Sequence, residues 1–199
     1  MSLLIESIKV VDGQYQNIFY HEQRLNRSLR TLCGVTEYID LEKFLAGFQQ
    51  PVNDVLKCRI IYDENEMAVE FIPYQIKTIE TLRVVEHDRI NYEFKYVNRK
   101  TIDRLFGLRR DCDDILIVKR GMVTDSSYCN IVFRKGSQWV TPWSPLLKGT
   151  QRQKLIDLGI ITEEEIRLKD IGTFDTWKLV NAMMEFNAPE YEMSNIFLK

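Results

Sequence analysis

A tight-turn signal near the start of the chain places the strongest constraint on its fold. Asp12 and Gly13 separate two stretches typical of β-strands, "LLIESIKVV" and "QYQNIFY". Asp-Gly favours a two-residue hairpin turn, because both central residues of such a turn take positive φ. The pattern then changes: in "YHEQRLNRSLRTLCG" leucines recur on one helical face, and a glycine ends the run. The chain therefore begins with a hairpin followed by an amphipathic helix that can cover it.

The rest of the first half repeats these two kinds of element. "DLEKFLAGFQQP" predicts a second helix with Asp40 as its N-cap, and "LKCRIIYDENEMAVEFIPY" predicts a second hairpin around "DENE". Together these segments predict a small α+β domain over residues 1–87, in which two helices cover one sheet.

The second half, residues 92–199, is richer in short strands. "RKTIDRLFGLRR" predicts a helix, and "DDILIVKRG", "MVTDSSYCNIVFRKG" and "SQWVTP" predict strands with glycine-containing turns. A further helix is expected to begin near Gly149 or Thr150, and "EIRLKDI" and "TWKLVNAMM" are expected to form strands. Many short strands with few helices predict a larger domain with a barrel-like sheet.

Composition excludes several classes of function. The net charge is -2, from 27 basic and 29 acidic residues, so we expect no general attraction to nucleic acid or to anionic membranes. The four cysteines and two histidines lack metal-ligand spacing, and no apolar run has membrane-spanning length. The N-terminus lacks the features of a signal peptide. We expect a cytoplasmic protein that binds no metal.

Lys95 is the residue that most needs an explanation. It lies between Phe94 and Tyr96, although lysine is strongly hydrated and normally kept in water. The local sequence permits two interpretations. The side chain snorkels from a strand edge, which is the commoner arrangement, or the amine is held in a dry site as a nucleophile.

Several motifs, in their order along the chain, resemble those of the class IV aminotransferases, which are pyridoxal-phosphate enzymes of fold type IV. The similar segments are "IESIKVVDG", "HEQRL" (21–25), "KYVNR" (95–99), "VTDSSYCNIVF", "VTPWSPLLKGTQR" and "DTWKLVNAM". Each is weak alone, but six in the correct order cover nearly the whole chain. That family includes branched-chain and D-amino-acid aminotransferases and 4-amino-4-deoxychorismate lyase. "KYVNR" is most similar to the lyase and D-amino-acid branch.

The resemblance implies the cofactor pyridoxal 5'-phosphate and a role for each matching residue. Lys95 would form the Schiff base and shuttle a proton. Asp125, where the family has glutamate, would hold the pyridine nitrogen protonated, although the residues alone also permit a turn aspartate. The implied phosphate ligands are Arg24, Gly149, Thr150, Gln151, Asn181 and Ala182. For Arg24 a solvated helix position is the alternative, and for the helix start an ordinary cap.

Four further residues are left with open roles. Asn130 is expected to brace the strand after Asp125, and Asn98 could fix the Lys95 segment. Glu6 and Arg59 either face the cleft or lie at a strand edge.

The expected function is that of an aminotransferase or a 4-amino-4-deoxychorismate lyase acting on a small amino-group substrate. The alternative is a cofactor-binding relative with little turnover, suggested by Asp125 and by termini shorter than the family's. The resemblance also implies a homodimer, to which the apolar residues Ile5, Ile8 and Val10 could contribute if they are not core residues.

Overall fold

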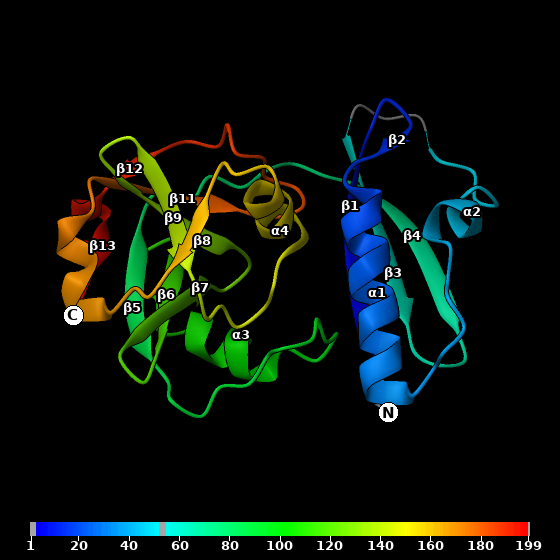
Figure 1. Cartoon of the computed structure of the whole chain (residues 1–199), viewed down its shortest axis with the longest axis horizontal. Helices are drawn as coiled ribbons and strands as arrows, with labels where there is room; N and C mark the ends of the chain where they lie inside the picture. Colours follow the sequence, from blue (N-terminus) through cyan, green and yellow to red (C-terminus); the bar gives the residue numbers. More distant parts are fainter. Residues whose placement is uncertain (1–2, 52–54, 199) are drawn as a thin grey trace. The chain divides into compact units, whose positions relative to one another are not determined.

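A computed structural model describes residues 3–51 and 55–198, which form two compact units (Figure 1). The first unit runs to Ile76 and includes Phe94–Asn98; the second contains Lys77–Glu93 and everything from Arg99 onwards. These units differ from the predicted division into 1–87 and 92–199. The strand at Leu82–Glu86 pairs with the sheet of the second unit, whereas segment 94–98 lies beside the first strand of the chain.

The first unit contains a four-stranded antiparallel sheet with strand order β2-β1-β3-β4. Its strands are β1 (Leu4–Val11), β2 (Gln14–Tyr15), β3 (Val55–Tyr62) and β4 (Met67–Pro73). Asp12 and Gly13 have φ values of 48° and 76°, as a two-residue turn with both centres left-handed requires. Both predicted hairpins are therefore confirmed.

Two helices belong to the same unit, α1 (Ile18–Cys33) and α2 (Leu41–Leu45). The prediction that "QYQNIFY" is a strand is wrong beyond Tyr15, because α1 already begins at Ile18. Gly34 ends α1 in the left-handed conformation with φ 70°, and the Asp40 side chain caps α2 by accepting a hydrogen bond from the Lys43 amide at 2.8 Å.

Alternation along β1 and β3 explains how this unit folds. Every second residue of each strand is buried, and all of these residues except Glu6 share one apolar cluster with leucines of α1 and α2. Ile8 and Val10 are part of that core, with exposed fractions of 0% and 2%, so they are core residues and not a surface for a partner subunit. Figure 1 shows α1 lying along the sheet that it covers.

The second unit contains a nine-stranded mixed sheet. Along its main path the order is β10-β9-β8-β7-β6-β5-β13, and β11 pairs with both β8 and β12. The strands are β5 (Leu82–Glu86), β6 (Asp114–Lys119), β7 (Met122–Ser126), β8 (Asn130–Lys135), β9 (Gln138–Pro142), β10 (Thr162–Glu164), β11 (Thr176–Val180), β12 (Tyr191–Glu192) and β13 (Ile196–Phe197). Two α-helices accompany them, α3 (Lys100–Phe106) and α4 (Thr150–Asp157).

Two strand predictions in this unit need correction: "TWKLVNAMM" is a strand only over Thr176–Val180 and then turns at Asn181, and "EIRLKDI" is not a strand. "EIRLKDI" makes only a single bridge, between Arg167 and Met122, and then turns into a 3-10 helix, Leu168–Thr173. The cause is the spacing of its buried residues: the turn brings Ile171 into the same apolar core as Ile166, which an extended strand could not do at this separation. Among the described residues, no helix is long and apolar enough to cross a membrane.

The register of β7, β8 and β11 brings Asp125, Asn130 and Asn181 to the same end of the sheet. Asn130 at the start of β8 pairs with Asp125 of β7 on one side and with Val180 of β11 on the other. The chain leaves β11 directly into Asn181, so three segments that are distant in sequence meet at one end of this sheet.

Candidate active site

Lys95 lies in the first unit, in a segment beside β1 that forms one isolated bridge, between Tyr96 and Leu4. The Ile5 amide donates to the Lys95 carbonyl at 2.9 Å, and the Val97 amide donates to the Leu3 carbonyl at 2.9 Å. The side chain is half-buried, and its Nζ donates to Oγ of Ser7 on β1 at 3.1 Å. The backbone around Lys95 is therefore held against the segment of β1, and its side chain contacts a polar partner.

Arg24 belongs to a buried cluster of charged and polar groups. Its Nε donates to Oε1 of Glu6 at 2.8 Å and its Nη2 to Oε2 at 2.5 Å, and Nδ1 of His21 lies 2.6 Å from the same Oε2. The exposed fractions of Arg24, Glu6 and His21 are 7%, 0% and 0%. Arg24 is thus not a solvated helix arginine, and Glu6 is not at a solvent-facing strand edge.

The protonation states in this cluster follow from its geometry. Burial alone would raise the pKa of Glu6, but the Arg24 guanidinium and the hydrogen bond from His21 outweigh it and lower that pKa to about 2. Burial lowers the pKa of His21, with the cations Arg24 and Lys95 adding to the effect and Glu6 opposing it. The cluster therefore contains an ionised Glu6, a charged Arg24 and a neutral His21 that donates from Nδ1, and its net charge is zero.

Asp125 is buried in the second unit with only neutral hydrogen-bond donors. Asn130 Nδ2 donates to its Oδ1 at 2.7 Å, and the Leu147 amide donates to its Oδ2 at 3.0 Å. Burial raises the pKa of Asp125 to about 6, although both donors and the nearby Arg152 charge oppose that rise. Within residues 3–51 and 55–198 the carboxylate forms no ion pair.

Asn130 connects Asp125 to the start of α4. Besides Asp125, its Nδ2 donates to the Leu147 carbonyl at 2.9 Å, which confirms the expectation that it braces the structure around Asp125. Gly149, the N-cap of α4, lies against the same side chain: a Cβ at 149 would be 2.0 Å from Oδ1 of Asn130. Only glycine fits at this position without displacing Asn130.

The first turn of α4 contains the other predicted ligands at the helix start. Thr150 and Gln151 are buried, with exposed fractions of 4% and 3%, and the N-cap Gly149 has no side chain with which to cap the helix. The first turn of a helix generally favours an anion, because its N–H groups lack intrahelical acceptors and the positive end of the helix dipole lies there. The predicted position of the helix start at Gly149 or Thr150 is confirmed.

Asn181 forms a turn at the end of β11. Its Oδ1 accepts from the amides of Met183 at 2.8 Å and Met184 at 2.9 Å, and its Nδ2 lies 3.0 Å from Sγ of Cys129. The side chain of Asn181 therefore shapes the turn that contains the half-buried Ala182.

Arg59 is placed differently from the predicted ligands. It forms an exposed cross-strand ion pair with Glu70, Nη1 to Oε2 at 3.3 Å. Asn98 is exposed and lies in the first unit with Lys95. The implied cofactor-binding residues are divided between the units: Lys95 and Arg24 belong to the first unit, and the others belong to the second.

Among the buried polar residues that were not expected from the sequence, His21 and Arg152 contact charged groups. His21 completes the Glu6–Arg24 cluster, and Arg152, with an exposed fraction of 1%, binds the Pro142 carbonyl at 2.8 Å and Glu163 at 2.6 Å. The signal for His21 was helical spacing: it precedes Leu25 by four residues and so lies on the buried face of α1. Arg152 likewise precedes the buried Leu155 by three residues.

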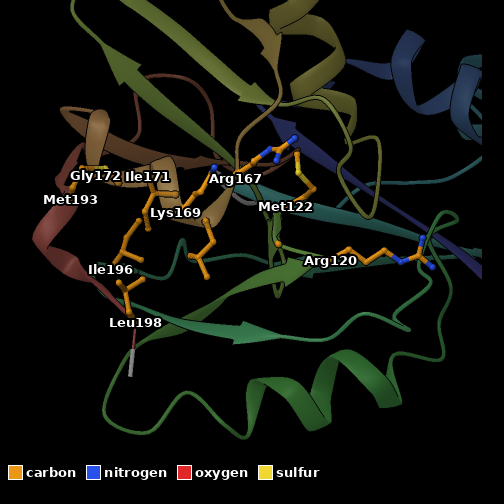
Figure 2. A pocket seen from close by; sticks show the side chains of 11 residues that line it. Arg120, Met122, Arg167, Lys169, Ile171, Gly172, Met193, Ile196 and Leu198 are labelled. Carbon is orange, nitrogen blue, oxygen red and sulfur yellow. The ribbon is translucent and has the colours of Figure 1, made fainter.

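The second unit also contains a cavity of about 830 Å³, shown in Figure 2. Its walls are the turn at Arg120–Met122, parts of the 167–172 segment, and Met193, Ile196 and Leu198 near the C-terminus. The lining includes no carboxylate and none of the predicted site residues, so this cavity is not the predicted cofactor site.

Comparison with known proteins gives consistent matches over most of the chain. The sequence profile of the amino-transferase class IV family matches residues 3–187. An uncharacterized protein of Haemophilus influenzae is 40% identical over 183 residues, which are 90% of this chain and 97% of that protein.

Solved structures are similar over the same length. A candidate 4-amino-4-deoxychorismate lyase from Haemophilus somnus 129PT has a TM-score of 0.85 at 34% identity, covering 94% of this chain and 98% of that one. An aminotransferase from Brucella abortus bound to the cofactor PLP has a TM-score of 0.77, with 99% and 83% covered. At 17% identity the second likeness concerns the fold alone. The expected α+β fold is confirmed.

Proposed function

Since this chain belongs to the class IV aminotransferase family, we propose that it is a pyridoxal-phosphate enzyme in which Lys95 holds the cofactor covalently. The observation that carries the proposal is the extent of the family match. Residues 3–187 include every predicted site residue, from Arg24 in α1 to Ala182 after β11.

Asp125 supports the choice of cofactor. Among the described residues this buried carboxylate accepts hydrogen bonds only from amides and forms no ion pair, and its pKa is raised to about 6. A protonated pyridine nitrogen is a cation of the right kind, and beside it Asp125 would stay ionised and hold the proton at that nitrogen. When bound, the cofactor supplies an electron sink for the bonds around the substrate Cα.

Lys95 and the anion-binding groups have separate tasks in this proposal. Lys95 Nζ, which Ser7 orients in the structure, attaches the cofactor and then moves the proton at the substrate Cα. Arg24 binds the phosphate through its guanidinium, and the first turn of α4 binds it through backbone N–H groups. The turn at Asn181 and Ala182 would complete this phosphate site.

The reaction that we favour is the lyase reaction, elimination of pyruvate from 4-amino-4-deoxychorismate. Its support is the 34% identity to the candidate lyase of Haemophilus somnus, which has nearly the same length, together with the "KYVNR" motif. Aminotransfer from an amino acid to a 2-oxo acid is the second candidate, and the match to the amino-transferase class IV family supports it.

One experiment separates these reactions. The purified protein is saturated with pyridoxal phosphate and incubated with 4-amino-4-deoxychorismate, while pyruvate is followed with a coupled dehydrogenase. In parallel, L- and D-amino acids are supplied with 2-oxoglutarate and glutamate is measured. Pyruvate formation that is lost in Lys95→Ala supports the lyase; glutamate formation alone supports the aminotransferase. Cofactor binding with neither product supports the alternative of a relative with little turnover.

We also propose a cytoplasmic homodimer as the working unit. A partner surface would exclude water from the reacting groups, which protects them from unwanted protonation. Light scattering at assay concentration tests this: a mass matching one 23.6 kDa chain with full activity contradicts it.

A further inference from the structure

We propose that Glu6 is a positioning residue: together with His21 it fixes the guanidinium of Arg24 in the one orientation that suits the cofactor phosphate. This inference rests on the proposed function, because it presumes that Arg24 binds that phosphate. The expected consequence is selectivity for the phosphorylated cofactor, which depends on a carboxylate that itself does not touch the phosphate.

The geometry of the Glu6–Arg24 ion pair supports this inference. Both oxygens of Glu6 are engaged by Arg24, at 2.8 Å from Nε and 2.5 Å from Nη2. Two parallel bonds to one carboxylate fix both the position and the plane of a guanidinium, which a single bond cannot do. The edge that contains Nη1 is therefore held in a fixed direction, and that is the edge with which Arg24 would meet the phosphate.

His21 makes the arrangement more rigid. Its Nδ1 lies 2.6 Å from Oε2 of Glu6, so one carboxylate oxygen joins the imidazole of α1 to the guanidinium of the same helix. His21 and Arg24 are three residues apart and thus lie on the same face of α1, while Glu6 approaches from β1. All three side chains are at least nine-tenths buried, so water does not compete for these contacts.

If only its charge mattered, Glu6 would weaken phosphate binding and would not strengthen it. A carboxylate beside Arg24 cancels part of the attraction between the guanidinium and a phosphate dianion. Simple structural stabilisation is a third possibility, because a buried arginine without a partner is costly. The three explanations can be separated, since only positioning predicts that a change which keeps the charge of Glu6 weakens binding of the phosphate specifically.

The test measures two affinities for each variant, one for pyridoxal phosphate and one for pyridoxal, which lacks the phosphate. Both affinities are determined by titration, from the absorbance of the bound compound. The ratio of the pyridoxal phosphate affinity to the pyridoxal affinity isolates the contribution of the phosphate to binding. Glu6→Asp keeps the negative charge but withdraws the carboxylate by one methylene, so both bonds to Arg24 cannot persist. We expect the ratio to fall about tenfold, equivalent to about 1.4 kcal/mol, with pyridoxal affinity unchanged.

A second variant and a matched control accompany it. Glu6→Gln keeps the side-chain length but gives Arg24 only one acceptor, and the ratio is again expected to fall. Glu70→Gln removes the carboxylate of the exposed Arg59–Glu70 pair in the same unit and should leave the ratio unchanged. In an Arg24→Lys background, Glu6→Asp should have no further effect on the ratio, because lysine cannot form the two parallel bonds.

Each outcome decides between the explanations. An unchanged or increased ratio in both Glu6 variants, with normal wild-type binding, overturns the positioning role and leaves the proposed function intact. Equal losses of pyridoxal phosphate and pyridoxal affinity indicate a purely structural role and also overturn it. If the wild type binds neither compound, the proposed function fails and this inference fails with it.

Discussion

Gly149 and Asn130 lie so close together that any side chain at 149 would displace the asparagine: a Cβ would be 2.0 Å from Oδ1 of Asn130. Asn130 in turn donates to Asp125 and to the Leu147 carbonyl, so a substitution at Gly149 is transmitted to the buried carboxylate. The start of α4 and the environment of Asp125 are therefore one structural element.

Gly149→Ala is expected to destabilise the protein by about 1–3 kcal/mol, the range for inserting a methyl group into a packed site. Urea denaturation measures it. The matched control is Gly172→Ala, where a Cβ would meet nothing within 4 Å; its effect should stay within about 0.5 kcal/mol. Equal effects of the two substitutions would show that the contact with Asn130 is not restrictive.

Asp125 should give the cofactor-free protein a specific pH dependence. Its pKa is raised from 3.8 to about 6 in the folded state, so between these values the folded state binds the proton more tightly than the unfolded state. The contribution of Asp125 to stability is therefore largest below pH 3.8 and is lost as the pH rises to about 6. The total contribution is about 3 kcal/mol, from roughly two pKa units of about 1.4 kcal/mol each.

The comparison of wild type with Asp125→Asn isolates this effect. Urea denaturation of both proteins at pH 4, 5, 6 and 7 should give a stability difference that changes with pH in favour of the asparagine variant as pH rises. A difference that is constant from pH 4 to 7 contradicts the raised pKa. Added pyridoxal phosphate should reduce the pH dependence of the wild type, because a pyridinium partner favours the ionised carboxylate.

Arg152 should be important for stability and not for the phosphate. Its Nη2 joins the Pro142 carbonyl and the Glu163 carboxylate, and the side chain is fully buried. Arg152→Ala leaves the buried carbonyl without its donor and opens a cavity, so we expect a loss of about 3–5 kcal/mol. Thermal unfolding measures it; a loss below 1 kcal/mol would contradict this role.

Arg24→Ala is expected to weaken pyridoxal phosphate binding about ten- to a hundredfold, from loss of a charge-assisted contact of about 1.5–3 kcal/mol. The measurement is a cofactor titration, with Arg27→Ala on the exposed side of α1 as control. Wild-type affinity in Arg24→Ala would remove Arg24 from the phosphate site.

Local patterns predicted the elements of the fold well. The Asp12–Gly13 turn, the α1 stripe ending at Gly34 and the start of α4 all depend on short-range backbone preferences, which the sequence contains directly. The division of the chain into two units was harder to predict from the sequence. It depends on β5 pairing with β6 and on segment 94–98 pairing with β1, and such long-range contacts leave no local signal.

The sequence allows the burial of these polar side chains to be predicted, but not which of them contact each other. Glu6 alternates with Leu4 and Ile8 on β1, and Arg24 lies on the buried face of α1, so periodicity places both side chains inward. That they meet each other follows only from the packing of α1 on the sheet. The same holds for Arg152, whose acceptors lie on β9 and β10.

The most direct test of the account is covalent labelling at Lys95. The protein is saturated with pyridoxal phosphate, reduced with borohydride to make the attachment permanent, digested and analysed by mass spectrometry. We predict that the pyridoxyl mass is on the peptide containing "FKYVNR" and that Lys95→Ala abolishes it. A label on another lysine, or no label at saturating cofactor, would contradict covalent attachment of the cofactor at Lys95.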